Sequence, residues 1–191
     1  FIGAGTISPK FLVNKLLENE NKKLKLSFID LEKFYKKKNE FDNKDIAKFI
    51  SENSFGEMKI KLTYEEDLLG TAGTLIENLS FFKDKIGILI HVDNATNFDL
   101  KELIEAHKRR TEGCILTMLT FNSKNPKACG IIEKNSKGVM TNFHEKIDNP
   151  PSDCANGAIY IFEDDFISWL NNNRYHQVKD FSNDILPRLL N

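Results

Sequence analysis

This sequence of 191 residues contains few cysteines, lacks long apolar runs and has no large excess of either charge. The three cysteines, Cys114, Cys129 and Cys154, are widely spaced and form no C-x-x-C pair, and their odd number argues against a disulfide framework. No apolar run is long enough to span a membrane, and the sequence does not start with a signal peptide. We therefore expect a protein of the reducing cytoplasm with no membrane partner.

The charges nearly cancel, because 27 lysines and arginines face 28 acidic residues for a formal net charge of -1. A general electrostatic footprint for nucleic acid is therefore missing, and we expect no nucleic-acid partner. The sequence also contains no internal repeat, no low-complexity block and no convincing linker. Its length suits one domain with a sizeable core, so a single domain over residues 1–191 is predicted.

Strands and helices are predicted from the spacing of apolar residues. Asp99 is a candidate N-cap, because Leu100, Leu103 and Ile104 follow it on one face of a helix. The predicted strands lie at residues 24–29, 58–63, 86–92, 114–121, 130–133, 139–143 and 158–162. Early alternation of strands and helices, followed by a hairpin, predicts an α/β fold. We expect a Rossmann-like, mixed and mostly parallel central sheet flanked by helices.

The central stretch of the sequence is a glycine turn between a strand and a helix, Gly70-Thr71-Ala72-Gly73. Small residues let the backbone approach a ligand closely, and free amides at a helix start favour anions or base carbonyls. The alternative is a tight strand-to-helix turn with no ligand.

A carboxylate, Asp93, ends the apolar strand that follows this turn. In open α/β sheets such a strand end lies at the edge where ligands bind, and one carboxylate can hold Mg²⁺ when phosphates supply other ligands. The alternative is a turn cap within residues 93–97.

Two further polar pairs occur near later strands. Glu145 and Lys146 end a strand; a carboxylate accepts hydrogen bonds from sugar hydroxyls and an ammonium offsets phosphate charge. Neighbouring strand residues point to opposite faces, so both serve one site only if the strand ends or bulges there. The alternative is a surface charge pair. Asn156 and Gly157 open the next strand, where the amide could bind a hydroxyl or form a turn.

These segments, taken in order, resemble the sugar-1-phosphate nucleotidyltransferase family, whose members make nucleotide sugars. The similarity covers roughly residues 58–190. Residues 66–73 (E-D-L-L-G-T-A-G) resemble the nucleobase-contacting segment, residues 92–93 (V-D) the metal-binding strand end, residues 129–133 (C-G-I-I-E) a family strand, residues 143–146 (F-H-E-K) the sugar and phosphate motif, and residues 155–160 (A-N-G-A-I-Y) the Asn-x-Gly-Ile-Tyr segment.

The resemblance implies transfer of a nucleoside monophosphate from a nucleoside triphosphate to a sugar-1-phosphate, with Mg²⁺ as cofactor and a GT-A-like fold. It assigns catalysis to Asp93, Lys146 and Lys10, with Asp93 as the metal ligand. Nucleotide binding is assigned to Gly3, Gly5, Thr6, Leu69, Gly70, Thr71 and Gly73. Sugar-phosphate binding is assigned to Gly130, Glu145, Lys146, Asn156 and Gly157.

The sequence departs from the family at both ends. Only Gly3-Ala4-Gly5-Thr6 and Ser8-Pro9-Lys10-Phe11 resemble the long glycine-rich loop, and its arginine is absent. A second metal-binding aspartate of the family would follow Asn191. We therefore expect that the nucleotidyltransferase domain over residues 1–191 is incomplete at its glycine-rich loop and at its C-terminus; the alternative is a degenerate relative that does not catalyse.

Substrate choice stays open in the sequence. The L-G-T-A-G segment with F-H-E-K looks most like mannose-1-phosphate guanylyltransferases, which favours GTP binding, a mannose-1-phosphate-like sugar and a role in cell-surface polysaccharide biosynthesis. A non-catalytic nucleotide- or sugar-phosphate-binding relative and a phosphocholine-type cytidylyltransferase are the alternatives. Oligomeric state is also open, with a homo-oligomer among the alternatives.

Overall fold

The computed structural model describes residues 27–31, 48, 51–52, 59–63, 65, 67, 69–91, 97–173 and 178–190. The chain divides into two compact units, which we describe separately. The first comprises Phe1–Leu69 and Ile90–Asn97, and the second Gly70–Leu89 and Phe98–Asn191. Within the described part of the chain, none of the helices has the length and apolar character that crossing a membrane would need.

In the first unit, the described strands are β1 (Ser27–Leu31) and β2 (Lys59–Thr63). They pair in parallel, with Ser27 opposite Lys59 and Leu31 opposite Thr63. Parallel neighbours need a crossover connection rather than a tight turn, which agrees with the long stretch of sequence between these two strands.

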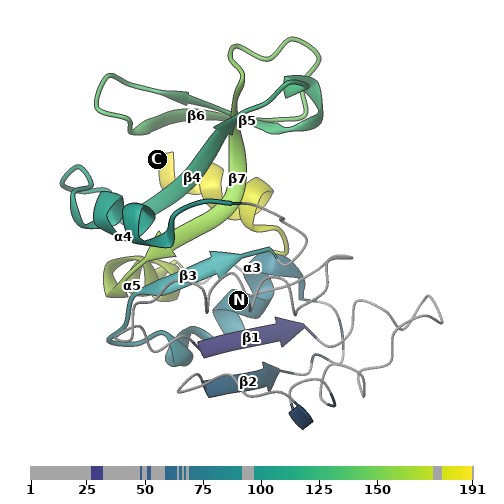
Figure 1. The fold of residues 1–191 in the computed structure, drawn as a ribbon, viewed down its shortest axis with the longest axis vertical. Coiled ribbons are helices and arrows are strands. Elements are labelled where there is room, and N and C mark those ends of the chain that lie inside the picture. Colours follow the sequence, from purple (N-terminus) through teal and green to yellow (C-terminus); the bar gives the residue numbers. More distant parts are fainter. Residues whose placement is uncertain are drawn as a thin grey trace. The chain divides into compact units, whose positions relative to one another are not determined.

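The second unit contains the larger sheet (Figure 1), with the order β3-β7-β5-β6 and with β4 also paired to β7. Its strands are β3 (Gly87–Ile90), β4 (Leu116–Asn122), β5 (Gly130–Lys134), β6 (Met140–Glu145) and β7 (Cys154–Phe162). Its described α-helices are α3 (Gly70–Glu77), α4 (Leu100–Lys108) and α5 (Asp164–Asn172). They are accompanied by the short 3-10 helices η1 (Leu79–Phe81), η2 (Pro126–Ala128) and η4 (Leu186–Leu190) and the short π-helix η3 (Phe181–Ile185).

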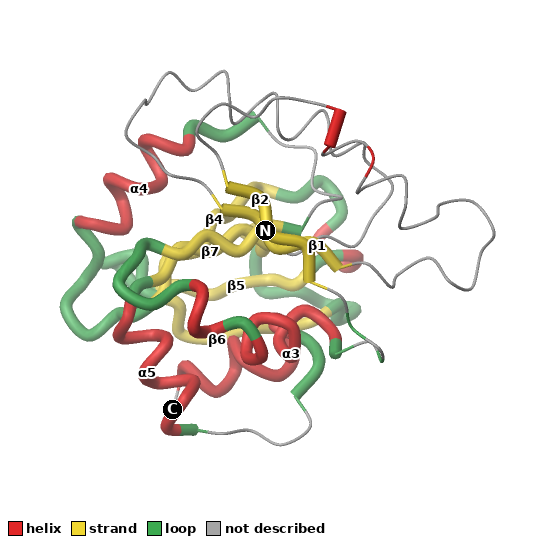
Figure 2. The backbone as a smooth tube through the Cα atoms, turned by 90° about the horizontal axis from the view of Figure 1, so that it is seen from below, coloured by secondary structure: helices red, strands yellow, loops and turns green. Residues whose placement is uncertain are grey.

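Helices cover this sheet on both faces, which confirms the α/β class with a helix-flanked sheet. Figure 2 shows α4 on one side of the strands and α3 and α5 on the other. The sheet itself differs from the mostly parallel one expected, because β4 with β7, β5 with β6, and β5 with β7 all pair antiparallel. The physical reason lies in the connections: β4 to β7 follow one another without an intervening α-helix, and short connections join antiparallel strands.

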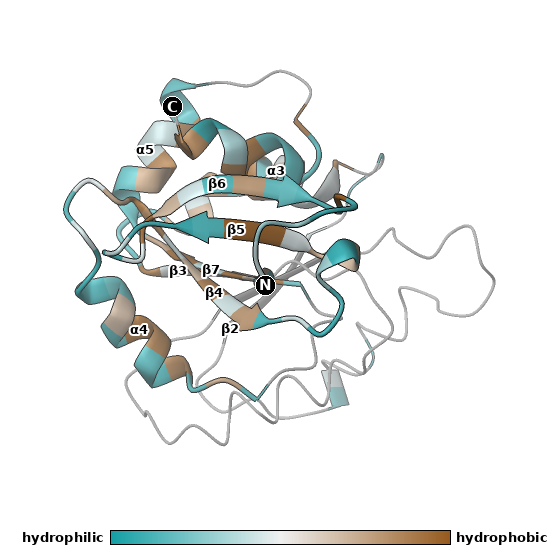
Figure 3. Cartoon of the chain, turned by 90° about the horizontal axis from the view of Figure 1, so that it is seen from above, coloured by the Kyte–Doolittle hydropathy of each residue, from teal (hydrophilic) through white to brown (hydrophobic). Residues whose placement is uncertain are grey.

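Aromatic rings from β7 and its neighbours form the centre of the core. Phe162 packs on Phe82 at 5.2 Å and on Phe166 at 5.1 Å between ring centroids, and all three are 0–5% exposed. Burying one such side chain stabilises a fold by about 1.5–3 kcal/mol. Gly87 lies against the Phe162 ring, so a side chain at that position would collide with it. Figure 3 shows the apolar middle of β5 in brown, where Ile131 and Ile132 add to this core.

The N-cap of α4 is the one predicted at Asp99. Its carboxylate accepts hydrogen bonds from the amides of Lys101 (2.8 Å) and Glu102 (3.3 Å). Leu100, Leu103, Ile104 and His107 are buried, so the predicted apolar face of this helix is also confirmed. This N-cap starts the helix and stabilises it by about 1 kcal/mol.

Candidate functional site

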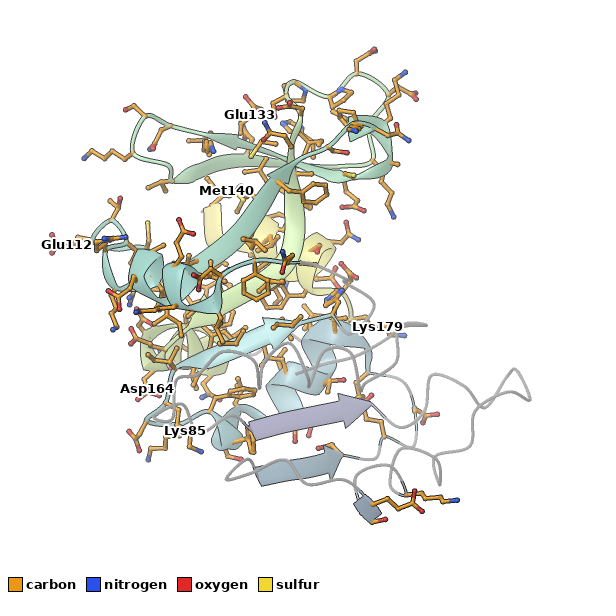
Figure 4. All side chains as sticks on the ribbon, in the orientation of Figure 1. Lys85, Glu112, Glu133, Met140, Asp164 and Lys179 are labelled. Atoms are coloured by element: carbon orange, nitrogen blue, oxygen red, sulfur yellow. The ribbon has the colours of Figure 1, made fainter. Side chains whose placement is uncertain are left out.

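The glycine turn begins α3 and is fixed by a distant part of the chain. Gly70 has φ +76°, and a Cβ atom there would collide with the carbonyl group of Lys179. The Ala72 amide donates to the Lys179 carbonyl oxygen (3.0 Å), and the Phe181 amide donates to Thr71 Oγ1 (2.8 Å). Figure 4 shows Lys179 beside α3. Packing within the chain is therefore enough to require glycine at position 70.

Packing alone explains the glycine at position 70, so the role of this turn in nucleotide binding stays a prediction. Leu69, in the first unit, donates its amide to Glu65 Oε2 at 3.1 Å, and Glu65 is buried. Gly73 is half-buried within the first turn of α3. Gly3, Gly5 and Thr6, which were assigned to the same subsite, lie outside the described residues.

Gly130 and Glu145 are direct partners across the β5–β6 pair. A Cβ atom at Gly130 would come within 2.8 Å of Glu145 Oε2 and 2.7 Å of the Phe143 ring. The missing side chain at Gly130 therefore leaves room for the carboxylate of Glu145. The sequence placed both residues in one predicted subsite, and the structure brings them together.

The glutamate–lysine pair lies at the end of strand β6. β6 stops at Glu145, and Lys146 has φ +49°, which breaks the alternation of side chains between the two faces. The Lys146 ammonium then lies 3.4 Å from Glu145 Oε1, with 65% of the lysine side chain and 30% of the glutamate side chain exposed. Because the strand ends between them, Glu145 and Lys146 can both serve one site. The ion pair also fits the alternative of a surface charge pair.

Asn156 lies on the next strand at a matching position. Ile131 of β5 pairs with Ala155 of β7, and both are fully buried. Gly130 comes one residue before Ile131, and Asn156 comes one residue after Ala155, so in this antiparallel pair both belong to the opposite face of the sheet. Glu145 pairs with Gly130 and shares that face. Three adjacent strands thus bring together the residues assigned to the sugar phosphate.

A bulge in β7 follows Asn156. Thr120 of β4 pairs with Asn156, and Met118 pairs with Tyr160, so β7 contains two more residues than β4 between these pairs. Ala158 has φ +51° within the bulge. A Cβ atom at Gly157 would lie 2.8 Å from the Leu119 carbonyl oxygen, so close approach of the β4 backbone accounts for glycine there.

Tyr160 and Ser182 join Asn156 in a hydrogen-bonded cluster that the sequence did not predict. Asn156 Nδ2 donates to the Tyr160 hydroxyl (2.8 Å) and to Ser182 Oγ (3.2 Å). Burial raises the pKa of Tyr160 to about 12; the hydrogen bonds to Ser182 and Asn156 oppose this shift, and the charges of Asp180 and Glu145 add to it. Tyr160 therefore stays neutral at ordinary pH. The Glu145 carboxylate is close enough for its charge to affect this hydroxyl.

A second polar cluster lies between α4, β4 and the start of α5. His107 contacts Thr117 Oγ1 through Nδ1 (2.7 Å), and Arg110 binds Glu163 (2.9 Å) and Asp165 (3.2 Å). Burial lowers the pKa of His107, the charge of Arg110 lowers it further, and Glu163 and Asp165 partly oppose the shift. None of these residues was assigned to the site.

Two assigned catalytic residues, Lys10 and Asp93, lie outside the described residues. Among the residues that the structure describes, no group of three or more His, Cys, Asp or Glu side chains is placed to hold a metal ion. The Mg²⁺ assignment thus depends on Asp93 and stays a prediction.

Comparison with known proteins identifies the class to which this arrangement belongs. The chain belongs to the sugar-1-phosphate nucleotidyltransferase family, because residues 24–191 match the family model described as Nucleotidyl transferase. It is 25% identical over 144 residues to mannose-1-phosphate guanylyltransferase of Mycobacterium tuberculosis, covering 75% of this chain and 38% of that protein. It is 26% identical over 128 residues to glucose-1-phosphate adenylyltransferase of Bacillus subtilis, covering 63% of this chain and 33% of that protein.

Solved structures share the fold. HddC from Yersinia pseudotuberculosis matches with a TM-score of 0.66 and 18% identity, covering 93% of this chain and 72% of that one. A Bacillus anthracis protein assigned as a glucose-1-phosphate thymidylyltransferase matches with a TM-score of 0.61 and 16% identity, covering 76% of this chain and 55% of that one. The chain spans about a third of the length of the two named relatives, 38% of one and 33% of the other.

Proposed function

We propose that the protein transfers a nucleoside monophosphate from a nucleoside triphosphate to a sugar-1-phosphate. A phosphate oxygen of the sugar-1-phosphate attacks the α-phosphorus in line, the bond from that phosphorus to the β-phosphate oxygen breaks, and pyrophosphate leaves. The nucleophile is already ionised, so no general base is needed. Positioning and neutralisation of phosphate charge would supply the catalysis.

The observation that carries this proposal is the common face of β6, β5 and β7. Glu145 and Gly130 are strand partners there, and the Lys146 ammonium lies 3.4 Å from the Glu145 carboxylate. Glu145 would accept hydrogen bonds from sugar hydroxyls, and Lys146 would offset the charge of the phosphate. Asn156 and Gly157 would border the same sugar. Membership of the family supports this assignment.

The remaining roles depend on the family resemblance. Gly70 and Gly73, with Leu69 and Thr71, would contact the base, and Gly3, Gly5 and Thr6 would contact the phosphates. Lys10 would offset phosphate charge, and Asp93 would hold Mg²⁺, which when bound neutralises charge on the α-phosphate. A cytoplasmic location and a role in cell-surface polysaccharide biosynthesis belong to this proposal.

GTP and a mannose-1-phosphate-like sugar are the substrates that we favour. The segments at residues 69–73 and 143–146 look most like those of mannose-1-phosphate guanylyltransferases. The relative from Mycobacterium tuberculosis carries that name, whereas the relative from Bacillus subtilis is named for an adenylyl transfer to glucose-1-phosphate. Base and sugar must therefore be varied independently in any assay.

The test is pyrophosphate release by the complete gene product, across the four nucleoside triphosphates and several sugar-1-phosphates. We expect release that depends on both substrates, fastest with GTP and mannose-1-phosphate. Binding of either ligand with no release would favour a non-catalytic relative, and release only with CTP and phosphocholine would favour the cytidylyltransferase.

The sharpest variant is Asp93→Ala. We expect it to lower the turnover number by at least about 100-fold while the affinity for the sugar phosphate changes little, since a metal-bound phosphate belongs to the chemical step. Near-normal pyrophosphate release by Asp93→Ala would show that the assignment of Asp93 is wrong.

A further inference from the structure

Both N–H groups of the Asn156 side chain have hydrogen-bond partners inside the protein. Nδ2 donates to the Tyr160 hydroxyl and to Ser182 Oγ. Oδ1 accepts from the Ala158 amide (2.8 Å), and the Tyr160 hydroxyl, which accepts from Nδ2, also lies 3.1 Å from Oδ1. A primary amide has two N–H donors, so the Tyr160 hydroxyl and Ser182 Oγ occupy both of them.

The partners of Asn156 are themselves firmly held. Tyr160 is fully buried and packs on the Phe181 ring with 4.5 Å between centroids. Phe181 is also fully buried, and its amide donates to Thr71 Oγ1. Ser182 follows Phe181 directly. We call residues 178–182 the strap, because they contact α3 through Lys179 and Phe181 and contact β7 through Ser182.

The Asn156 amide in turn shapes the β7 bulge. Ala158 holds φ +51°, a conformation that residues other than glycine rarely adopt, and its amide donates to Asn156 Oδ1. The bulge also brings Gly157 against the Leu119 carbonyl. The β7 backbone at the bulge therefore depends on the orientation of one side chain.

We propose that Ser182 and Tyr160 are positioning residues, which hold the Asn156 amide so that the Gly157–Ala158 bulge is correctly shaped for the sugar phosphate. The inference rests on the proposed function and specifies how Asn156 serves it. Asn156 acts through the bulge that it shapes, since no N–H group of its amide is left for a hydroxyl. The strap connects this role to the glycine turn of α3.

The test compares Ser182→Ala with the wild type in the complete gene product, using GTP and mannose-1-phosphate. We expect the KM for the sugar phosphate to rise about 3- to 10-fold, the loss that follows from removing one hydrogen bond. The turnover number and the KM for the nucleotide should change less than 2-fold. Ser182→Thr, which keeps the hydroxyl, should restore the wild-type KM, and Tyr160→Phe should act in the same direction as Ser182→Ala.

Direct binding of the sugar by Asn156 would give a different result. If the Asn156 amide bound the sugar directly, Ser182→Ala would release one of its N–H groups, and the KM for the sugar phosphate would stay constant or fall. Either outcome overturns the inference. The matched control is Ser152→Ala, because Ser152 Oγ also makes two hydrogen bonds, to the Ile132 carbonyl and from the Cys154 amide, away from Asn156.

A second measurement separates this inference from the proposed function. Amide hydrogen exchange at Ala158, followed by NMR without substrates, should be about 3- to 10-fold faster in Ser182→Ala and unchanged in Ser152→Ala. Unchanged exchange in Ser182→Ala would overturn the inference whether or not the wild type releases pyrophosphate. Absence of pyrophosphate release by the wild type, with faster exchange in Ser182→Ala, would count against the proposed function only.

Discussion

The glycine turn at Gly70 and the strand end at Glu145–Lys146 differ in how much of their sequence the fold itself explains. At Gly70, the positive φ and the approach of the Lys179 carbonyl require glycine without any ligand. At Lys146, 65% of the side chain is exposed, and its ammonium lies 3.4 Å from Glu145. Packing gives no reason for this lysine. The strand end is therefore the stronger structural pointer to function, although the glycine turn is the more conspicuous motif in the sequence.

Gly70→Ala should produce the largest effect, and it should be an effect on stability. The substitution forces a Cβ atom against backbone atoms in a left-handed conformation, so we expect a loss of about 3 kcal/mol or more in the free energy of unfolding. Chemical denaturation measures it. Gly138→Ala is the control, since Gly138 has φ +77° but nothing within 4 Å of the added atom, and about 1 kcal/mol should be lost. Equal losses in the two variants would refute the packing explanation for Gly70.

Lys146→Met should produce the reverse pattern. We expect kcat/KM to fall about 10- to 100-fold, since hydrogen bonds to charged groups contribute about 1.5–3 kcal/mol. The free energy of unfolding should change by less than about 1 kcal/mol, because an exposed ion pair stabilises little. Lys137→Met, at an exposed residue of the β5–β6 loop, is the matched control. A loss of activity as large in Lys137→Met would remove the distinction between the two lysines.

Gly130→Ala tests the space beside Glu145. The added Cβ atom would meet the Phe143 ring and Glu145 Oε2 at 2.7 and 2.8 Å, which are the far ends of side chains that can move. We expect the KM for the sugar phosphate to rise about 10-fold, with less than about 1.5 kcal/mol of stability lost. Steady-state kinetics measure the KM, and chemical denaturation measures the loss of stability. An unchanged KM would show that Gly130 does not border the sugar site.

The smallest expected effect concerns the His107 cluster, remote from both regions in sequence. The pKa of His107 is lowered from its ordinary value of 6.5, first by burial and then by Arg110, so the unfolded chain binds the proton more readily. The corresponding stability is fully present above about pH 6.5 and is lost as the pH falls below that value, by at most about 1.4 kcal/mol per pH unit.

Arg110→Met should raise the pKa of His107 in an NMR titration, because a positive charge near the ring is removed. His107→Gln should flatten the dependence of the unfolding free energy on pH between about 5 and 7. A steeper acid dependence in His107→Gln would contradict the assignment of this effect to His107.

Local signals in the sequence were sufficient for local structure. Asp99 was predicted as an N-cap and is one, because a cap depends on residues two and three positions away. The hairpin of β5 and β6 follows for the same reason. The order in which the strands pair was harder to predict from the sequence. Neighbouring strands are determined by the connections between strands and not by the strands themselves.

The candidate site was predictable only in part. Gly130, Glu145 and Asn156 belong to recognisable segments, and the sheet register brings them to one face. The left-handed conformation of Lys146 is a single dihedral angle that its residue type does not favour, so spacing could not predict it. Ser182 lies 26 residues beyond Asn156 and carries no motif, so only the tertiary fold identifies it.

The most direct measurement of the central claim is the stoichiometry of the products formed by the complete gene product. With a nucleoside triphosphate, a sugar-1-phosphate and Mg²⁺, we predict one nucleotide sugar, detected by mass spectrometry, for each pyrophosphate released. Formation of no nucleotide sugar with any pair of substrates, or release of pyrophosphate that does not require the sugar phosphate, would contradict the account.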